Sequence, residues 1–177
     1  MIRKKLGAIR RSGGAARSCP LRFAPCWLGP EQLVGLGFRY WMLGRTTGEI
    51  TCWARAWTLY SGMFGTAGAK RTVEALASWV RAVSASSRRD IQVNPEGCGS
   101  FCRDECVAIS MIAACQHRTC PALRACAFAL IESAMIDTVV DRAQDFADVM
   151  AGLDQVLSPG SVVEAPVDLA PVNRLPS

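Results

Sequence analysis

Apolar residues recur every three or four positions between residues 30 and 157, and this spacing restricts the fold more than any other feature. It is clearest near the end of that range, where one side of a helix carries Ile136, Val140, Ala143, Ala147 and Met150. Four aspartates fall on the other side: Asp137, Asp141, Asp145 and Asp148. Since the range has no convincing strand alternation, the sequence predicts an all-α fold, a bundle of about five helices.

Local start and stop signals place the helices. Pro30 suits a first helical position and Glu31 a first turn, and Gly44 is the expected end of that helix. Thr46 and Glu49 have the spacing of a capping box, and Ser100 is a candidate N-cap. The predicted helices begin near residues 30, 46, 66, 100 and 121. The last is expected to run to about residue 157, with a kink near Ser133, and the last two form a cysteine-rich C-terminal helical hairpin.

An aromatic stripe marks the second predicted helix. Its members recur at helical spacing: Ile50, Trp53, Trp57 and Tyr60. Such a stripe usually faces other helices in a core. The alternative is an exposed aromatic platform for a ligand or a nucleobase.

The charge is unevenly distributed along the chain. The net charge is +5, yet residues 1–29 hold seven of the 20 Lys and Arg and no acid. We therefore expect a basic, disordered arm over 1–29, a helical domain over 30–157 and a flexible, proline-containing tail over 158–177. The alternatives for the arm are a transit peptide, or a segment that is attracted to nucleic acid or to a membrane surface.

No membrane span is expected, because the longest uncharged stretch, residues 56–69, is 14 residues long. Arginines interrupt every candidate signal sequence in the arm, which disfavours secretion and favours a cytoplasmic protein. The nine cysteines are then expected to be reduced thiols, and a cysteine cluster in that setting indicates metal or redox chemistry.

Six of the cysteines fall within residues 98–126, with the single histidine among them. The spacings match those of zinc sites, and thiolates suit zinc, copper(I) or an iron–sulfur cluster. The candidate ligands are Cys98, Cys102, Cys106, Cys115, His117 and Cys120. Helical geometry separates Cys106 from Cys115 by about 13 Å along the axis, so we expect two half-sites of three ligands each.

Two other interpretations of the cysteines stay open: small apolar core residues, or a thiol redox switch. Nothing marks a nucleophilic serine beside the single histidine, and no phosphate-binding glycine loop is present, so the sequence leans against an enzyme. The leading hypothesis is a small helical protein that binds a soft metal or a cluster. The alternative is a non-catalytic interaction or regulatory protein, with an unidentified protein partner or nucleic acid bound by the basic arm.

Overall fold

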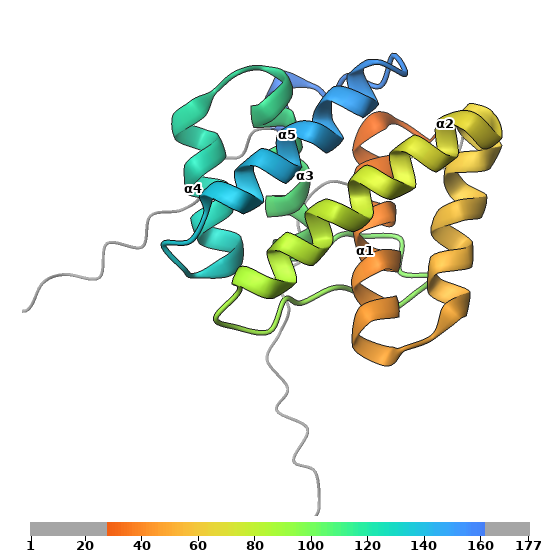
Figure 1. Ribbon diagram of the computed structural model, residues 1–177, viewed down its shortest axis with the longest axis horizontal. Coiled ribbons are helices and arrows are strands. Elements are labelled where there is room, and N and C mark those ends of the chain that lie inside the picture. The colour runs from red at the N-terminus through yellow and green to blue at the C-terminus, as the bar shows by residue number, and fades with distance from the viewer. Residues whose placement is uncertain (1–27, 162–177) are drawn as a thin grey trace, which may run out of the picture.

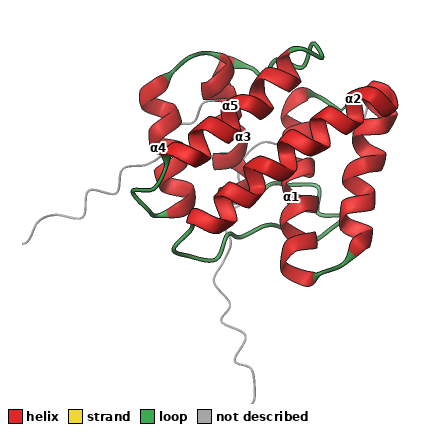
Figure 2. Cartoon of the chain, in the orientation of Figure 1, coloured by secondary structure: helices red, strands yellow, loops and turns green. Residues whose placement is uncertain are grey.

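The computed structural model describes residues 28–161 (Figure 1). Its elements are α1 (Pro30–Thr47), α2 (Ile50–Ser86), α3 (Arg103–Gln116), α4 (Cys120–Ile131), α5 (Asp137–Ala151) and a short 3₁₀ turn, η1 (Pro159–Ser161). All regular structure in the described residues is helical (Figure 2), which confirms the predicted all-α bundle. None of these helices is long and apolar enough to cross a bilayer.

The helices surround one core. α3 packs against α1, α4 and α5, and α2 packs against α1 and α5. Trp79 of α2 lies between two other rings at the centre, with its ring centroid 5.3 Å from that of Phe38 and 5.5 Å from that of Phe146. Tyr60 is also buried, and its hydroxyl donates a hydrogen bond to the Leu33 carbonyl.

α1 begins as predicted and ends later. Pro30 is the first helical residue and Glu31 lies in the first turn. The predicted end at Gly44 is wrong, because the helix continues to Thr47 and is closed by Gly48 in the left-handed region, with φ 74°. Gly44 instead lets α2 approach: a Cβ added there would lie 2.5 Å from Nε1 of Trp53.

α2 combines the second and third predicted helices. They meet at a kink at Gly65, whose φ of 67° and ψ of 177° lie outside the helical region. The predicted capping box is wrong: Thr46 still belongs to α1, where its hydroxyl donates to the Met42 carbonyl, and Glu49 is the N-cap without a side-chain bond.

The aromatic stripe is core at one end only. Tyr60 is fully buried, but Ile50 is 75% exposed and Trp57 is 38% exposed. The buried face of this part of α2 is shifted by one residue and includes Cys52 and Ala56.

The predicted hairpin exists as α3 and α4, and the long fifth helix is wrong. α4 ends at Ile131, and Glu132 adopts a left-handed conformation with φ 49° before α5 starts. The chain therefore breaks where a kink was expected. In α5 the predicted acidic face is exposed, and its apolar face packs on the core.

The folded unit extends past the expected start of the tail. The Ser161 carbonyl accepts a hydrogen bond of 2.7 Å from Ser110 in α3, and the Ser161 hydroxyl lies 3.0 Å from Oε1 of Glu31 in α1. The predicted arm, apart from Leu28 and Gly29, and the rest of the predicted tail lie outside the described residues.

Candidate functional site

The six predicted ligands lie in three different settings. Cys98 and Cys102 belong to the segment before α3, and Cys102 is the N-cap of α3 rather than Ser100. Cys106 and Cys115 are buried on α3, His117 caps its C-terminal end, and Cys120 is an exposed first residue of α4.

The first predicted half-site is not assembled around a common point. The Cys98 thiol lies 3.4 Å from the Ser100 hydroxyl, and hydrogen bonding to Ser100 lowers the pKa of Cys98. The Cys102 thiol donates instead to the Gln92 carbonyl at 3.1 Å, and burial raises its pKa to about 11. Cys106 faces the apolar core.

The second half-site is also dispersed. Burial raises the pKa of Cys115 to about 12, which favours a protonated core thiol. Nε2 of His117 lies 2.8 Å from the Leu157 carbonyl. Within residues 28–161 no three Cys, His, Asp or Glu side chains are placed to hold one metal ion. Binding of zinc, copper(I) or an iron–sulfur cluster therefore stays a prediction.

A different site, built on two neighbouring acids, was not anticipated from the sequence. Glu105 is fully buried in the first turn of α3, and its carboxylate accepts hydrogen bonds of 2.6 and 3.1 Å from the equally buried Arg39 of α1. It also accepts the backbone N–H groups of Asn94 at 3.2 Å and Cys102 at 2.7 Å. The Cys102 bond completes the capping box of α3.

Arg39 has further partners in the segment that precedes α3. It donates hydrogen bonds of 2.6 Å to the carbonyls of Cys98 and Ser100, and its guanidinium lies 5.1 Å from the centre of the Phe101 ring. All three nitrogens of this buried guanidinium are therefore hydrogen-bonded, as a charge in a core requires.

Asp104 makes the second pair. Both of its carboxylate oxygens accept hydrogen bonds of 2.7 Å from Arg89, and one also accepts the backbone N–H of Gln92 at 2.8 Å. The hydrogen bonds to Asp104 raise the pKa of Arg89. Nε of Arg89 lies 3.2 Å from a Glu132 oxygen, an ion-pair distance without hydrogen-bond alignment. We call Arg39, Arg89, Asp104 and Glu105 the clasp.

The clasp holds residues 90–94 in an extended conformation. The N–H groups of Gln92 and Asn94 donate hydrogen bonds to Asp104 and Glu105, respectively. The Gln92 carbonyl accepts a hydrogen bond from the Cys102 thiol. In an extended chain, backbone groups two residues apart point to the same side, which matches the two amides that meet α3. The side chains alternate as well: Ile91 and Val93 pack on the core, whereas Asp90 and Gln92 are exposed.

The other edge of this segment is unpaired. Among residues 28–161, no hydrogen bond engages the backbone N–H or C=O of Ile91 or Val93. By the same alternation, these groups point away from α3.

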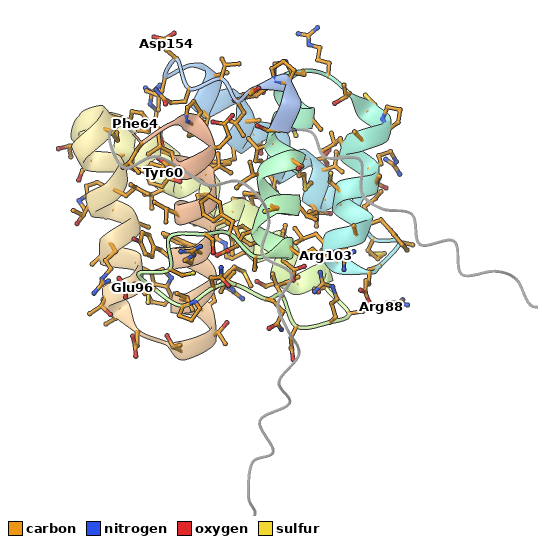
Figure 3. The ribbon with its side chains drawn as sticks, turned by 180° about the vertical axis from the view of Figure 1, so that it is seen from behind. Tyr60, Phe64, Arg88, Glu96, Arg103 and Asp154 are labelled. Atoms are coloured by element: carbon orange, nitrogen blue, oxygen red, sulfur yellow. The ribbon has the colours of Figure 1, made fainter. Side chains whose placement is uncertain are left out.

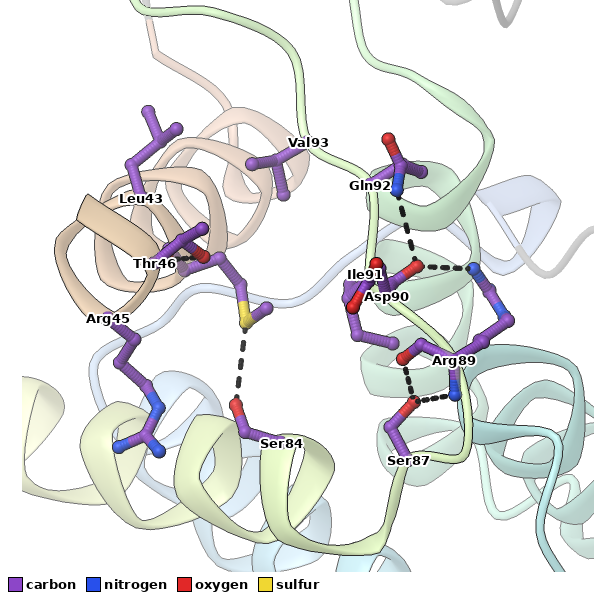
Figure 4. A pocket seen from close by; sticks show the side chains of 11 residues that line it. Leu43, Arg45, Thr46, Ser84, Ser87, Arg89, Asp90, Ile91, Gln92 and Val93 are labelled. Atoms are coloured by element: carbon purple, nitrogen blue, oxygen red, sulfur yellow. Dashed lines mark hydrogen bonds between the residues drawn. The ribbon is translucent and has the colours of Figure 1, made fainter. Parts of the chain in front are cut away.

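A groove of about 500 Å³ lies along that unpaired edge (Figure 4). Its walls are the end of α1, the end of α2 and the segment after α2, and no residue of α3 lines it. The apolar lining comes from Met42, Leu43, Ile91 and Val93, and Ser84, Ser87 and Thr46 add hydroxyls. Each of these hydroxyls already donates its proton to a backbone carbonyl, so toward a ligand it can only accept a hydrogen bond.

The charged groups at the groove differ in availability. Arg89 is held by Asp104, whereas the exposed Arg45 forms no ion pair with any described residue. Away from the groove, Glu96 lies beside the first half of α2 (Figure 3), where it forms an ion pair with Arg55. The groove therefore offers apolar surface, one available cation and a free backbone edge.

No protein-family model matches the chain, and no curated protein or solved structure matches it either. What the groove binds has to follow from its own chemistry.

Proposed function

We propose that this chain is a non-catalytic helical interaction protein that binds an extended peptide segment in the groove beside residues 90–94. The observation that carries the proposal is the unpaired backbone edge of Ile91 and Val93, in a segment whose other edge is bonded to α3. A free edge of extended chain is a template for another strand, and natural proteins usually cover such edges.

Strand addition explains both the affinity and the selectivity that the groove can provide. Main-chain hydrogen bonds to Ile91 and Val93 supply affinity for many sequences, and the side-chain surfaces beside them supply selectivity. Met42 and Leu43 favour apolar residues at alternate positions of the peptide, and Arg45 favours a carboxylate. The volume of about 500 Å³ lies within the range of ordinary ligand pockets.

The clasp supports this function because it prepares the edge before a partner arrives. Arg39 and Glu105 are buried and the segment is bonded to both acids, so little chain entropy remains to be lost on binding. The soft-metal hypothesis has no comparable support from the described side chains. Nucleic-acid binding by the basic arm concerns residues outside those described and stays a prediction.

The test is selection of a displayed random-peptide library on the full chain, followed by backbone amide NMR with an enriched peptide. We expect enriched peptides to alternate apolar residues and to shift the amide signals of Ile91 and Val93 most strongly. Val93→Pro removes one edge donor and should weaken binding about tenfold, whereas the matched Val93→Ala keeps the N–H and should weaken it less. Circular dichroism of both variants checks that the fold is retained. Failure to enrich any peptide, or shifts confined to another face, would overturn the proposal.

A further inference from the structure

We propose that the occupant of the groove is the C-terminal segment 163–169 of a second copy of this chain, so that the protein associates with itself by strand exchange. This inference rests on the proposed function, because it names the partner of the same groove. The segment lies outside the described residues. Its sequence, the position of Ser161 and the chemistry of the groove support this occupant.

The sequence of this segment alternates as a groove-bound strand would. Apolar residues occupy its odd-numbered positions: Val163, Ala165, Val167 and Leu169. Its even-numbered positions hold Glu164, Pro166 and Asp168. Apolar residues at every second position over seven residues are a strand pattern, and one apolar face suits the apolar lining of the groove.

The prolines define which edge of the segment can pair. In an extended chain the backbone groups of the odd-numbered residues share one edge and those of the even-numbered residues share the other. Pro166 lacks an N–H, so it is tolerated only on the edge that faces away from the groove. Pairing through Val163, Ala165 and Val167 meets that condition. Pro171 is odd-numbered and would fall on the pairing edge, where its missing N–H would end the strand soon after Leu169.

The charges of the segment and of the groove are complementary. Glu164 and Asp168 would lie on the outward side of the bound strand, near the rim of the groove where Arg45 is exposed. Since Arg45 has no ion pair among the described residues, an acidic strand gives it a partner without displacing an existing one.

Chain reach favours a second copy over the same molecule. Ser161 is held beside Glu31 at the start of α1, whereas the groove begins at Met42 on the same helix. Eleven residues of helix span about 17 Å. Pro166, at the middle of the segment, is five residues from Ser161 and can span about 17 Å only if fully extended on a straight path. No length is left to pass around α1, and a second copy has no such limit. Reciprocal exchange would fill both grooves of a symmetric dimer.

The experiment is sedimentation equilibrium of the full chain from micromolar to submillimolar concentration, with matched tail variants. Ala165→Pro removes an N–H from the pairing edge, whereas Ala170→Pro makes the same change, also next to a proline, on the other edge. We expect Ala165→Pro to weaken self-association about tenfold and Ala170→Pro to change it less than about twofold. Both substitutions lie outside the described residues. Circular dichroism of both variants checks that the fold is retained.

A second measurement separates this inference from the proposed function. A synthetic peptide of residues 161–171 should compete with self-association of the full chain and shift the Ile91 and Val93 amide signals. If library peptides bind the groove while the full chain stays monomeric and this peptide does not bind, self-association is wrong and the proposed function stands. Self-association that both proline variants leave unchanged would also overturn the inference. If neither library peptides nor this peptide reach Ile91 and Val93, both proposals fail.

Discussion

The clasp and the acidic face of α5 contain the same kinds of residue and use them in opposite ways. In α5, Arg142 and Asp145 form an ion pair at 2.8 Å with about half of each side chain exposed. In the clasp, Arg39 and Glu105 form one at 2.6 Å with almost no exposure. Exposed pairs contribute little to stability, because water solvates each partner well when they separate. Buried pairs are costly to break, since one charge is then left without water or a partner.

The fold therefore depends on charge at the clasp much more than on the acidic face of α5. The α5 aspartates keep one side of a helix in solvent, and many substitutions would serve there. Asp104 and Glu105 each bind an arginine and a backbone amide of residues 90–94, so they determine the conformation of the segment that forms the groove. We therefore expect the largest mutational effects in the clasp.

Removal of the buried carboxylate charge should have the largest effect on stability. Glu105→Gln leaves the Arg39 guanidinium buried and unpaired, and we expect it to lower the free energy of unfolding by about 3–5 kcal/mol. Urea denaturation followed by circular dichroism measures this change. The matched change on α5, Asp145→Asn, should cost less than about 0.5 kcal/mol. Equal effects of the two substitutions would remove the distinction between the regions.

The less deeply buried ion pair of the clasp, Arg89 with Asp104, should give an intermediate effect. Arg89→Ala removes two charge-assisted hydrogen bonds from Asp104 and leaves it the amide of Gln92, so we expect a loss of about 1.5–3 kcal/mol. Arg142→Ala on α5 is the control and should again cost less than about 0.5 kcal/mol. A loss for Arg89→Ala as small as that of the control would show that Asp104 is well solvated without Arg89.

The cysteines allow a smaller comparison based on pH. The pKa of Cys115 is raised to about 12 by burial, compared with about 8.5 for an unfolded thiol. Above pH 8.5, approximately, the unfolded chain releases this proton and the folded chain keeps it, so stability should fall with rising pH. The slope for this thiol is about 1.4 kcal/mol per pH unit. Urea denaturation between neutral and alkaline pH should show a shallower decline for Cys115→Ala than for the native chain.

Cys98 in the clasp region provides the contrast to that thiol. Its pKa is lowered, mainly by hydrogen bonds with Ser100, so it should react with iodoacetamide at lower pH than Cys115 or Cys126. Peptide mapping after timed alkylation of the native protein measures the order. Labelling of Cys115 before Cys98 would contradict the placement of these two thiols.

The parts of the fold that could be predicted depend on local signals. Pro30 and Glu31 mark a helix start through the fixed φ of proline and the helix dipole, which both act within one turn. The α5 pattern needs only helical spacing and a core to face. The break at Glu132 and the kink at Gly65 were harder, because helical spacing is similar on both sides of each. Gly44 was misassigned because its small size serves contact with Trp53 instead of helix termination.

The candidate site could not be predicted, because its partners are distant in the sequence. Arg39 is 66 residues from Glu105, and Arg89 is 15 residues from Asp104. Spacing within one helix connects neither acid to an arginine. Spacing also predicted that Cys102 and Cys106 belong to one half-site, but Cys102 precedes the helix as its N-cap and its thiol donates a hydrogen bond to the Gln92 carbonyl. The one available signal for the clasp was the pair of adjacent acids, Asp104 and Glu105, which follows a segment that contains Arg89.

The most direct test of the account is amide hydrogen exchange measured residue by residue across the segment from Asp90 to Asn94. The clasp should protect the N–H groups of Gln92 and Asn94, whereas those of Ile91 and Val93 should exchange rapidly at concentrations where the protein is monomeric. Addition of a groove-binding peptide should then slow Ile91 and Val93. Uniformly rapid exchange, or protection of Ile91 and Val93 in the free monomer, would contradict the account, because the groove would then have no prepared and open edge.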